Sequence, residues 1–175
     1  PPPLYSSAAS DGYKRQGLHF GWSAKDGQLR DAWVNPFLAP GDDEPEQRGE
    51  VIWRAPAGPS LVVGARPSEW PDTSSTGVHE FSRARNGEWG TSRRIGSLAM
   101  HETASGEIVP ELVLVRNFEL SEVDHSKRYW FRPGPGALTI KSVKGCDALK
   151  HPAPAGEAPW IELIPHPGQT ECSLR

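Results

Sequence analysis

The sequence predicts an all-β protein, an antiparallel β-sandwich of about eight to ten short strands with little helix; a partly closed β-barrel is the alternative. Runs of apolar and β-branched residues recur about every ten residues, each flanked by Gly, Pro, Asn or Asp, which is typical of such folds. Asp26-Gly27 and Asn86-Gly87 suit two-residue hairpin turns. No segment keeps the helical period of about 3.6 residues.

The chain begins with a small, polar stretch led by three prolines, and we expect residues 1–16 to be a flexible N-terminal arm. Residues 17–175 then form a single all-β domain, because 175 residues suit one domain. Without an initiator Met or a signal segment, the arm fits a processed, exported chain, tethered or free.

Leu18 to Asn35 predict a hairpin folded about Asp26-Gly27, which pairs Trp22 with Asp31 and Phe20 with Trp33. One apolar face then contains Leu18, Phe20, Trp22, Ala24, Leu29, Asp31 and Trp33. Asp31 is the unusual member of this face, because a buried carboxylate needs a partner or its pKa rises.

Residues 36–49 are rich in proline and acidic side chains and predict an exposed loop between this hairpin and two short strands, 50–54 and 60–66. A second loop, 67–77, contains Trp70. An exposed Trp70 would stack on a sugar ring or fill a pocket of a partner; alternatively, it folds back and covers the core.

Val78 to Ile95 predict a second hairpin, folded about Asn86-Gly87, in which Glu80 faces Arg93. Val78, Ala84, Trp89 and Ile95 then face inward. The opposite face carries the candidate binding residues His79, Phe81, Arg83, Arg85 and Arg94. Arginine suits the recognition of carboxylates, and Phe81 adds an apolar anchor, so this face predicts a binding surface; an ordinary solvated face is the alternative.

Further strands are expected at 111–120, 128–132, 137–144 and 160–164, while 148–151 forms one helical turn at best. The two cysteines, Cys146 and Cys172, bracket a proline-rich segment, and a disulfide between them would restrain it. Such a bridge predicts an oxidising, extracytoplasmic compartment, secreted or periplasmic. Two unrelated thiols are the alternative.

Charge and motifs exclude several classes of function. The net charge of −3 gives no basic excess, so we expect no nucleic-acid partner, and no apolar run is long enough for a transmembrane segment. The dipeptides His79-Glu80 and His101-Glu102 lack metal-site spacing, and no glycine-rich phosphate loop occurs, so no metal and no cofactor is expected.

Three functions remain. The sequence favours a non-catalytic extracytoplasmic module that recognises a protein partner, such as an inhibitor or a toxin-neutralising protein. A carbohydrate-binding module that uses Trp70 is the second hypothesis. The third is a glycosidase-like hydrolase in which Asp31 and Glu80, both facing inward, act as the paired carboxylates.

Overall fold

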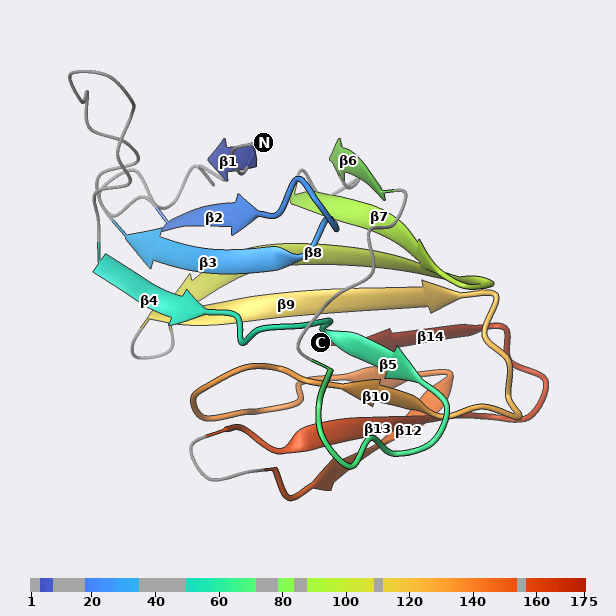
Figure 1. The fold of residues 1–175 in the computed structure, drawn as a ribbon. Coiled ribbons are helices and arrows are strands. Elements are labelled where there is room, and N and C mark those ends of the chain that lie inside the picture. The colour runs from blue at the N-terminus through green and yellow to red at the C-terminus, as the bar shows by residue number, and fades with distance from the viewer. Residues whose placement is uncertain are drawn as a thin grey trace.

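Figure 1 shows the protein as a computed structural model. The structure describes residues 18–34, 50–71, 79–83, 88–108, 112–153 and 157–175, and the backbone of residues 4–7. These residues form fourteen strands and no helix. The predicted all-β class is confirmed, with more strands than the eight to ten expected.

The strands form three antiparallel sheets, none of which closes into a barrel within the described part. One four-stranded sheet has the order β1 (Leu4–Ser7), β2 (Leu18–Trp22), β3 (Leu29–Val34), β4 (Glu50–Arg54). The other has the order β12 (Cys146–His151), β13 (Trp160–Pro165), β10 (Tyr129–Phe131), β5 (Leu61–Val63). The six-stranded sheet has the order β11 (Val143–Lys144), β14 (Glu171–Leu174), β9 (Leu112–Ser121), β8 (Leu98–Ile108), β7 (Trp89–Ile95), β6 (His79–Arg83).

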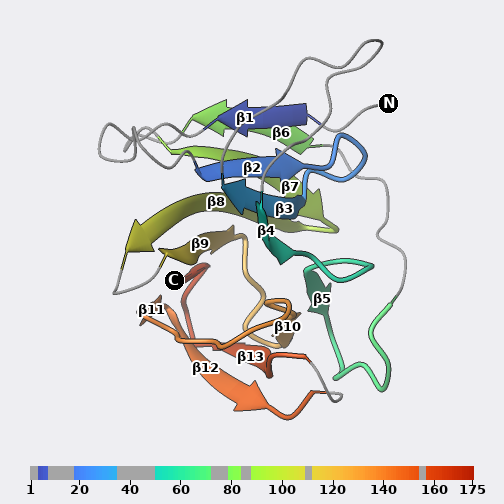
Figure 2. The same ribbon diagram turned by 90° about the vertical axis from the view of Figure 1, so that its left-hand side faces the viewer.

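Both four-stranded sheets pack on the same face of the six-stranded sheet, as Figure 2 shows from the side. Met100 and Phe118 belong to a core shared with the β5–β10–β12–β13 sheet, whereas Ala104 and Leu114 pack in a core with the β1–β4 sheet. Because side chains alternate along a strand, Met100 and Ala104 of β8 point to one face, as do Leu114 and Phe118 of β9. The molecule is therefore a sandwich with two cores side by side.

A disulfide joins Cys146 of β12 to Cys172 of β14, with their Cα atoms 5.6 Å apart. Both cysteines are buried in the first core. The predicted pairing is confirmed, and it links one of the two small sheets covalently to the six-stranded sheet.

The predicted register of the first hairpin is wrong, by one residue at Phe20 and, after an irregularity in the pairing between Gly21 and Trp22, by two residues at Trp22. Trp22 faces Leu29, and Phe20 faces Ala32. The turn is a four-residue loop, closed by hydrogen bonds from Ser23 N to Gln28 O and from Gly27 N to Ser23 O, both 2.8 Å. A register shift of one residue moves the partner strand's side chains to the other face.

The predicted apolar face therefore holds only in part. Phe20, Trp22 and Leu29 share the second core as expected. Trp33 lies on the opposite face, where its ring stacks on His19 with centroids 5.6 Å apart.

The second hairpin is also shifted by one residue, because His79, not Glu80, faces Arg93, and Phe81 faces Thr91. The predicted turn, Asn86-Gly87, lies outside the described residues. Trp89, expected to face inward, is 39% exposed. Phe81 packs against the second core instead.

Four strands were not expected from the sequence: β1, β8, β12 and β14. β8 is the longest strand, and β12 occupies the segment for which one helical turn was considered. The N-terminal strand β1 pairs with β2 from Leu4 to Ser7. The division into an arm at 1–16 and a domain at 17–175 stays a prediction, because most of the arm lies outside the described residues.

Candidate functional site

The candidate site is a groove of about 460 Å³ between β4, the first half of β9 and the irregular segment that follows β10. These elements can be followed in Figure 1. Apolar side chains dominate its lining: Ile52, Trp53, Val113, Leu114, Val115, Phe118, Phe131, Leu138, Ile140, Ile161 and Leu174. Ile52 and Val113 are among the few large apolar residues that solvent reaches, at 36% and 41% exposure. This surface therefore combines exposure with apolar character.

The groove runs along one edge of β9. Strand β14 pairs with β9 between Phe118 and Ser121, and among the described residues no strand lies beside residues 112–116 on that side. Within the described part, none of the backbone hydrogen bonds outside the ladders reaches residues 112–116. Side chains from both faces of β9, Val113 and Leu114, line the same groove, as happens where a strand has no neighbour.

The opposite wall begins with Pro133-Gly134-Pro135-Gly136. Proline lacks the N–H that a strand ladder needs, so regular pairing stops after β10. Gly134 has a φ of 106°, and a Cβ there would lie 2.9 Å from the Trp53 ring. Glycine is therefore required for the backbone to lie against the indole.

Arg116 forms part of the groove floor although it stands in an apolar stretch of β9. Its Nε and Nη2 donate hydrogen bonds to Glu102 Oε1 at 3.0 and 2.7 Å, and its Nη1 donates to Pro133 O at 2.8 Å. The guanidinium carbon lies 4.9 Å from the ring centroids of Trp53 and Phe118. Such stacking stabilises a cation among aromatic rings.

Glu102 on the central strand β8 is shared by two arginines. Arg93 on β7 donates from Nη2 to Glu102 Oε2 at 3.0 Å, opposite the contact made by Arg116. The side chains of Glu102, Arg93 and Arg116 are 0%, 6% and 9% exposed. We call these three residues the buried triad.

The buried triad lies at the seam between the two cores. Glu102 lies on the same face of β8 as Met100 of the first core and Ala104 of the second, and between them. Arg93 also donates hydrogen bonds to Gly27 O and Ser60 Oγ. Burial lowers the pKa of Arg93; the charge of Glu102 opposes this, and the like charge of Arg116 adds to it.

A second carboxylate lies near the rim of the groove. Glu107 of β8 forms ion pairs with Lys141 and with Arg175. The hydrogen bond from Lys141 lowers the pKa of Glu107; burial opposes this effect, and the hydrogen bond from Arg175 adds to it. Glu107 is therefore held as a carboxylate between two cations.

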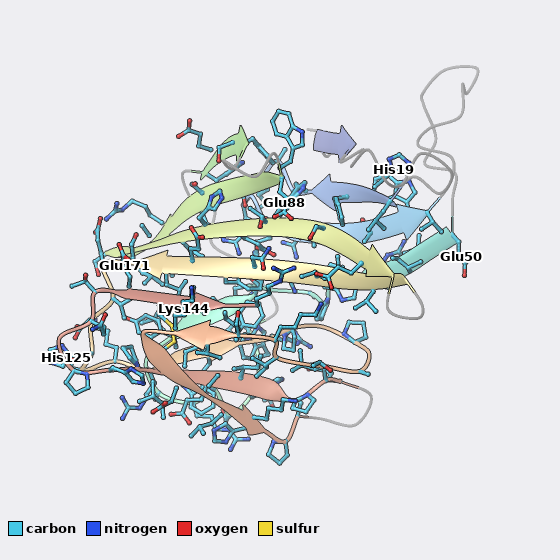
Figure 3. All side chains as sticks on the ribbon, turned by 180° about the vertical axis from the view of Figure 1, so that it is seen from behind. His19, Glu50, Glu88, His125, Lys144 and Glu171 are labelled. Carbon is cyan, nitrogen blue, oxygen red and sulfur yellow. A yellow bond between two sulfur atoms is a disulfide. The ribbon has the colours of Figure 1, made fainter. Side chains whose placement is uncertain are left out.

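The outer face of the six-stranded sheet is polar, and Figure 3 views the molecule from this side. One row of cross-strand neighbours runs from edge to edge: Glu80, Ser92, His101, Glu119, Ser173 and Lys144. These residues line an open groove of about 750 Å³. Ser92 Oγ and His101 Nδ1 lie 2.9 Å apart, but among the described residues no carboxylate bonds the imidazole to orient it as a base.

The two candidate catalytic carboxylates, Asp31 and Glu80, do not face inward, because both hairpins are shifted in register. Asp31 lies opposite Gly21 and accepts a hydrogen bond from Arg54 Nε at 2.9 Å. Glu80 is exposed on the outer face of the six-stranded sheet. The predicted pair of inward carboxylates is therefore wrong.

The predicted basic face is divided. His79 and Phe81 share the inner face with Arg93, whereas Arg94 lies on the outer face and pairs with Glu122. Arg83 is described by its backbone alone, and Arg85 lies outside the described residues. The structure thus does not bring His79, Phe81 and Arg94 together.

Trp70, predicted in a loop, is only 8% exposed. Its ring packs edge-on against Trp160 with centroids 5.0 Å apart, and its Nε1 donates to Pro59 O at 2.6 Å. The alternative in which Trp70 covers the core is the one observed, and an exposed Trp70 is wrong.

Arg116, Glu102 and the groove were not among the features predicted from the sequence. A signal for Arg116 exists, since it interrupts an alternating apolar face formed by Leu112, Leu114, Phe118 and Leu120. A charge at such a position indicates a buried partner. Glu102 interrupts the face of Leu98, Met100 and Ala104 in the same way.

Comparison of the chain with protein-family models, with curated proteins and with solved structures finds no match. A search of the described residues for a helix long and apolar enough to span a membrane finds none.

Proposed function

We propose that the protein is a non-catalytic binding module that recognises a protein partner by accepting an extended segment of it along the edge of β9 at residues 112–116. The observation that carries this proposal is the single groove lined by both faces of residues 113–116. An unpaired strand edge offers N–H and C=O groups to another strand, and apolar pockets beside it accept alternate side chains.

The dimensions support this mode of binding. The part of β9 that pairs with β8 but not with β14 includes residues 112–116, five residues that span about 16 Å at roughly 3.3 Å per residue. A groove of about 460 Å³ falls within the usual range for binding sites. The incoming strand would be collinear with β14, which occupies the same edge further along.

We further propose an extracytoplasmic location, secreted or periplasmic. Its support is the disulfide between Cys146 and Cys172, since disulfides persist in oxidising compartments. Two alternative functions were considered. Carbohydrate binding was expected to use an exposed Trp70, but Trp70 is buried. Hydrolysis was expected to use Asp31 and Glu80 as inward-facing carboxylates, but neither faces inward.

The test selects short peptides from a random-sequence display library on the whole chain. A selected peptide should slow amide hydrogen exchange at alternate positions of residues 112–116, since strand addition protects those N–H groups. The double variant Ile52→Thr, Val113→Thr keeps β-branched residues and removes apolar contacts; it should weaken binding about tenfold.

The matched control is Leu149→Thr, which changes an exposed apolar residue of β12 outside the lining of the groove. Its peptide affinity should equal that of the wild type. The proposal is overturned if no peptide is enriched, or if selected peptides bind without slowing exchange in β9.

A further inference from the structure

A second, much smaller cavity lies next to the buried triad, against the segment that joins β4 to β5. Its volume is about 10 Å³, close to the space that one water-sized particle needs. Two arginines line it, Arg116 of β9 and Arg132, which directly follows β10. None of its described lining residues is acidic; the others are Leu29, Trp53, Ala55, Pro56, Gly58, Pro59 and Ser60.

Two further arginines bind the wall of this cavity. Arg93 Nη2 donates a hydrogen bond to Ser60 Oγ at 2.7 Å, and Arg30 Nη1 donates one to Gly58 O at 3.4 Å. The side chain of Arg93 is buried, and that of Arg30 is 29% exposed. Four guanidiniums therefore gather around the cavity: Arg30, Arg93, Arg116 and Arg132.

The charges of this cluster do not balance. Among the described residues, three carboxylates pair with the four guanidiniums. The ion pairs are Asp26–Arg30, Glu157–Arg132, and Glu102 with both Arg93 and Arg116. Arginine keeps its proton in proteins, so loss of a proton does not remove the excess. Because the triad is buried, little solvent screens this charge, and it attracts an anion.

The lining side chains also keep hydrogen-bond donors for a ligand. Arg116 makes three hydrogen bonds, and Arg132 makes three as well, two to Glu157 and one to Ala57 O. A guanidinium carries more N–H groups than these, so within the described part of the chain each arginine retains unused donors. Ser60 Oγ accepts its bond from an arginine, so its own hydrogen can turn toward the cavity.

The wall formed by residues 55–60 is held in place, which fixes the size of the cavity. Pro56 and Pro59 restrict the backbone, because the proline ring locks φ. Three carbonyl oxygens of this segment each accept a hydrogen bond from a side chain: Ala57 O from Arg132, Gly58 O from Arg30 and Pro59 O from Trp70. The cavity is therefore preformed and selects a ligand by size.

We infer that this cavity binds a single halide ion, in practice chloride, between Arg116 and Arg132. The excess positive charge calls for an anion, and the volume limits it to one atom, because sulfate, phosphate and carboxylates are larger. The ion compensates the charge that Glu102 leaves unmatched by serving two arginines. This inference does not rest on the proposed function, since the cavity needs no peptide to fill it.

The test measures the melting temperature of the whole chain while sodium chloride replaces sodium gluconate at constant ionic strength. Constant ionic strength keeps the general screening of charges unchanged, and gluconate is too large for the cavity. Chloride should raise the melting temperature by about 2–4 °C and the rise should saturate, because the ion binds the folded state at one site. An absent rise, or one that stays linear in chloride, overturns the inference.

Arg132→Gln removes one lining guanidinium and the excess charge together, so the saturable rise should disappear. The matched control is Arg128→Gln, because Arg128 also pairs with a glutamate, Glu162, at 3.5 Å but does not line the cavity. This control should keep the rise. The measured quantity is the difference between the two salts, so a general loss of stability does not imitate the effect. A rise retained in Arg132→Gln overturns the inference.

Bromide locates the site without any substitution, because it has the charge of chloride and scatters X-rays anomalously. Crystals of the wild-type chain grown in sodium bromide should show an anomalous peak in contact with the guanidinium nitrogens of Arg116 and Arg132. Bromide peaks confined to other places would overturn the inference even if chloride raised the melting temperature.

Discussion

Arg116 and Glu102 meet side by side on neighbouring strands, with two guanidinium nitrogens, Nε and Nη2, 3.0 and 2.7 Å from one carboxylate oxygen. The second oxygen of Glu102 is occupied by Arg93 at 3.0 Å. A buried charge that loses its partner is far more costly than a buried pair, because water cannot replace the missing group. The seam between the two cores is thus sensitive to any change in its charge balance.

Glu102→Gln removes the shared carboxylate charge and leaves two buried guanidiniums facing a neutral amide. We expect a loss of about 3–5 kcal/mol in the free energy of unfolding. Urea denaturation measures this as a lower midpoint at an unchanged slope.

Glu119→Gln is the control for this variant, because Glu119 follows Phe118 on β9 but is exposed on the outer face. Its unfolding free energy should change by less than about 0.5 kcal/mol. Equal losses in the two variants would contradict the role assigned to the buried triad.

The disulfide should stabilise the fold substantially. For the separation of 26 residues between Cys146 and Cys172, chain entropy gives about 3.5 kcal/mol. The double variant Cys146→Ala, Cys172→Ala should lose about this amount. Dithiothreitol should destabilise the wild type but leave the double variant unaffected; an unchanged stability of the wild type in dithiothreitol would contradict the assignment.

Acidification should act through Glu157. The hydrogen bond from Arg132 lowers the pKa of Glu157, and Trp160 Nε1 adds a second one. A carboxyl whose pKa is lower in the folded state stabilises the fold above its unfolded pKa, about 4.3, and this contribution is lost as the pH falls through the folded value.

The melting temperature measured from neutral pH to below pH 4 should therefore fall less steeply for Glu157→Gln than for the wild type. At neutral pH the variant should be the less stable of the two. Parallel curves across this range would show that the Arg132–Glu157 pair does not contribute.

Trp70 should contribute to stability. Trp70→Ala removes a buried ring that packs on Trp160, and we expect a loss of about 3–5 kcal/mol in unfolding free energy. Trp89→Ala, at a position that is 39% exposed, is the matched control and should lose much less. Similar losses, measured by urea denaturation, would contradict the structural role.

The sequence predicted the fold class and the disulfide, because alternation and cysteine number are local signals. Both hairpin registers were wrong; for the first, the prediction depended on Asp26-Gly27 as a two-residue turn. In the first hairpin, Ser23 Oγ accepts a hydrogen bond from Lys25 N at 3.2 Å, and Asp26 Oδ1 accepts one from Gln28 N at 3.2 Å. These side-chain contacts favour the longer loop.

The groove was beyond reach of the sequence for a different reason. Its lining comes from β4, β9 and the segment that follows β10. These parts are far apart in the chain, and no local pattern encodes their approach. The ionic character of Arg116 was readable from its neighbours, but its partner Glu102 was not, since the pairing requires the register of β8 on β9.

The disulfide clamps only one of the two small sheets. Strands β1–β4 carry no covalent link of this kind to the rest, and their attachment depends on side-chain packing and on the contacts at the seam. One small sheet is thus linked covalently to the six-stranded sheet, and the other is attached by non-covalent contacts alone. Native-state fluctuations should open β1–β4 first, while β12–β14 stay closed until the whole chain melts.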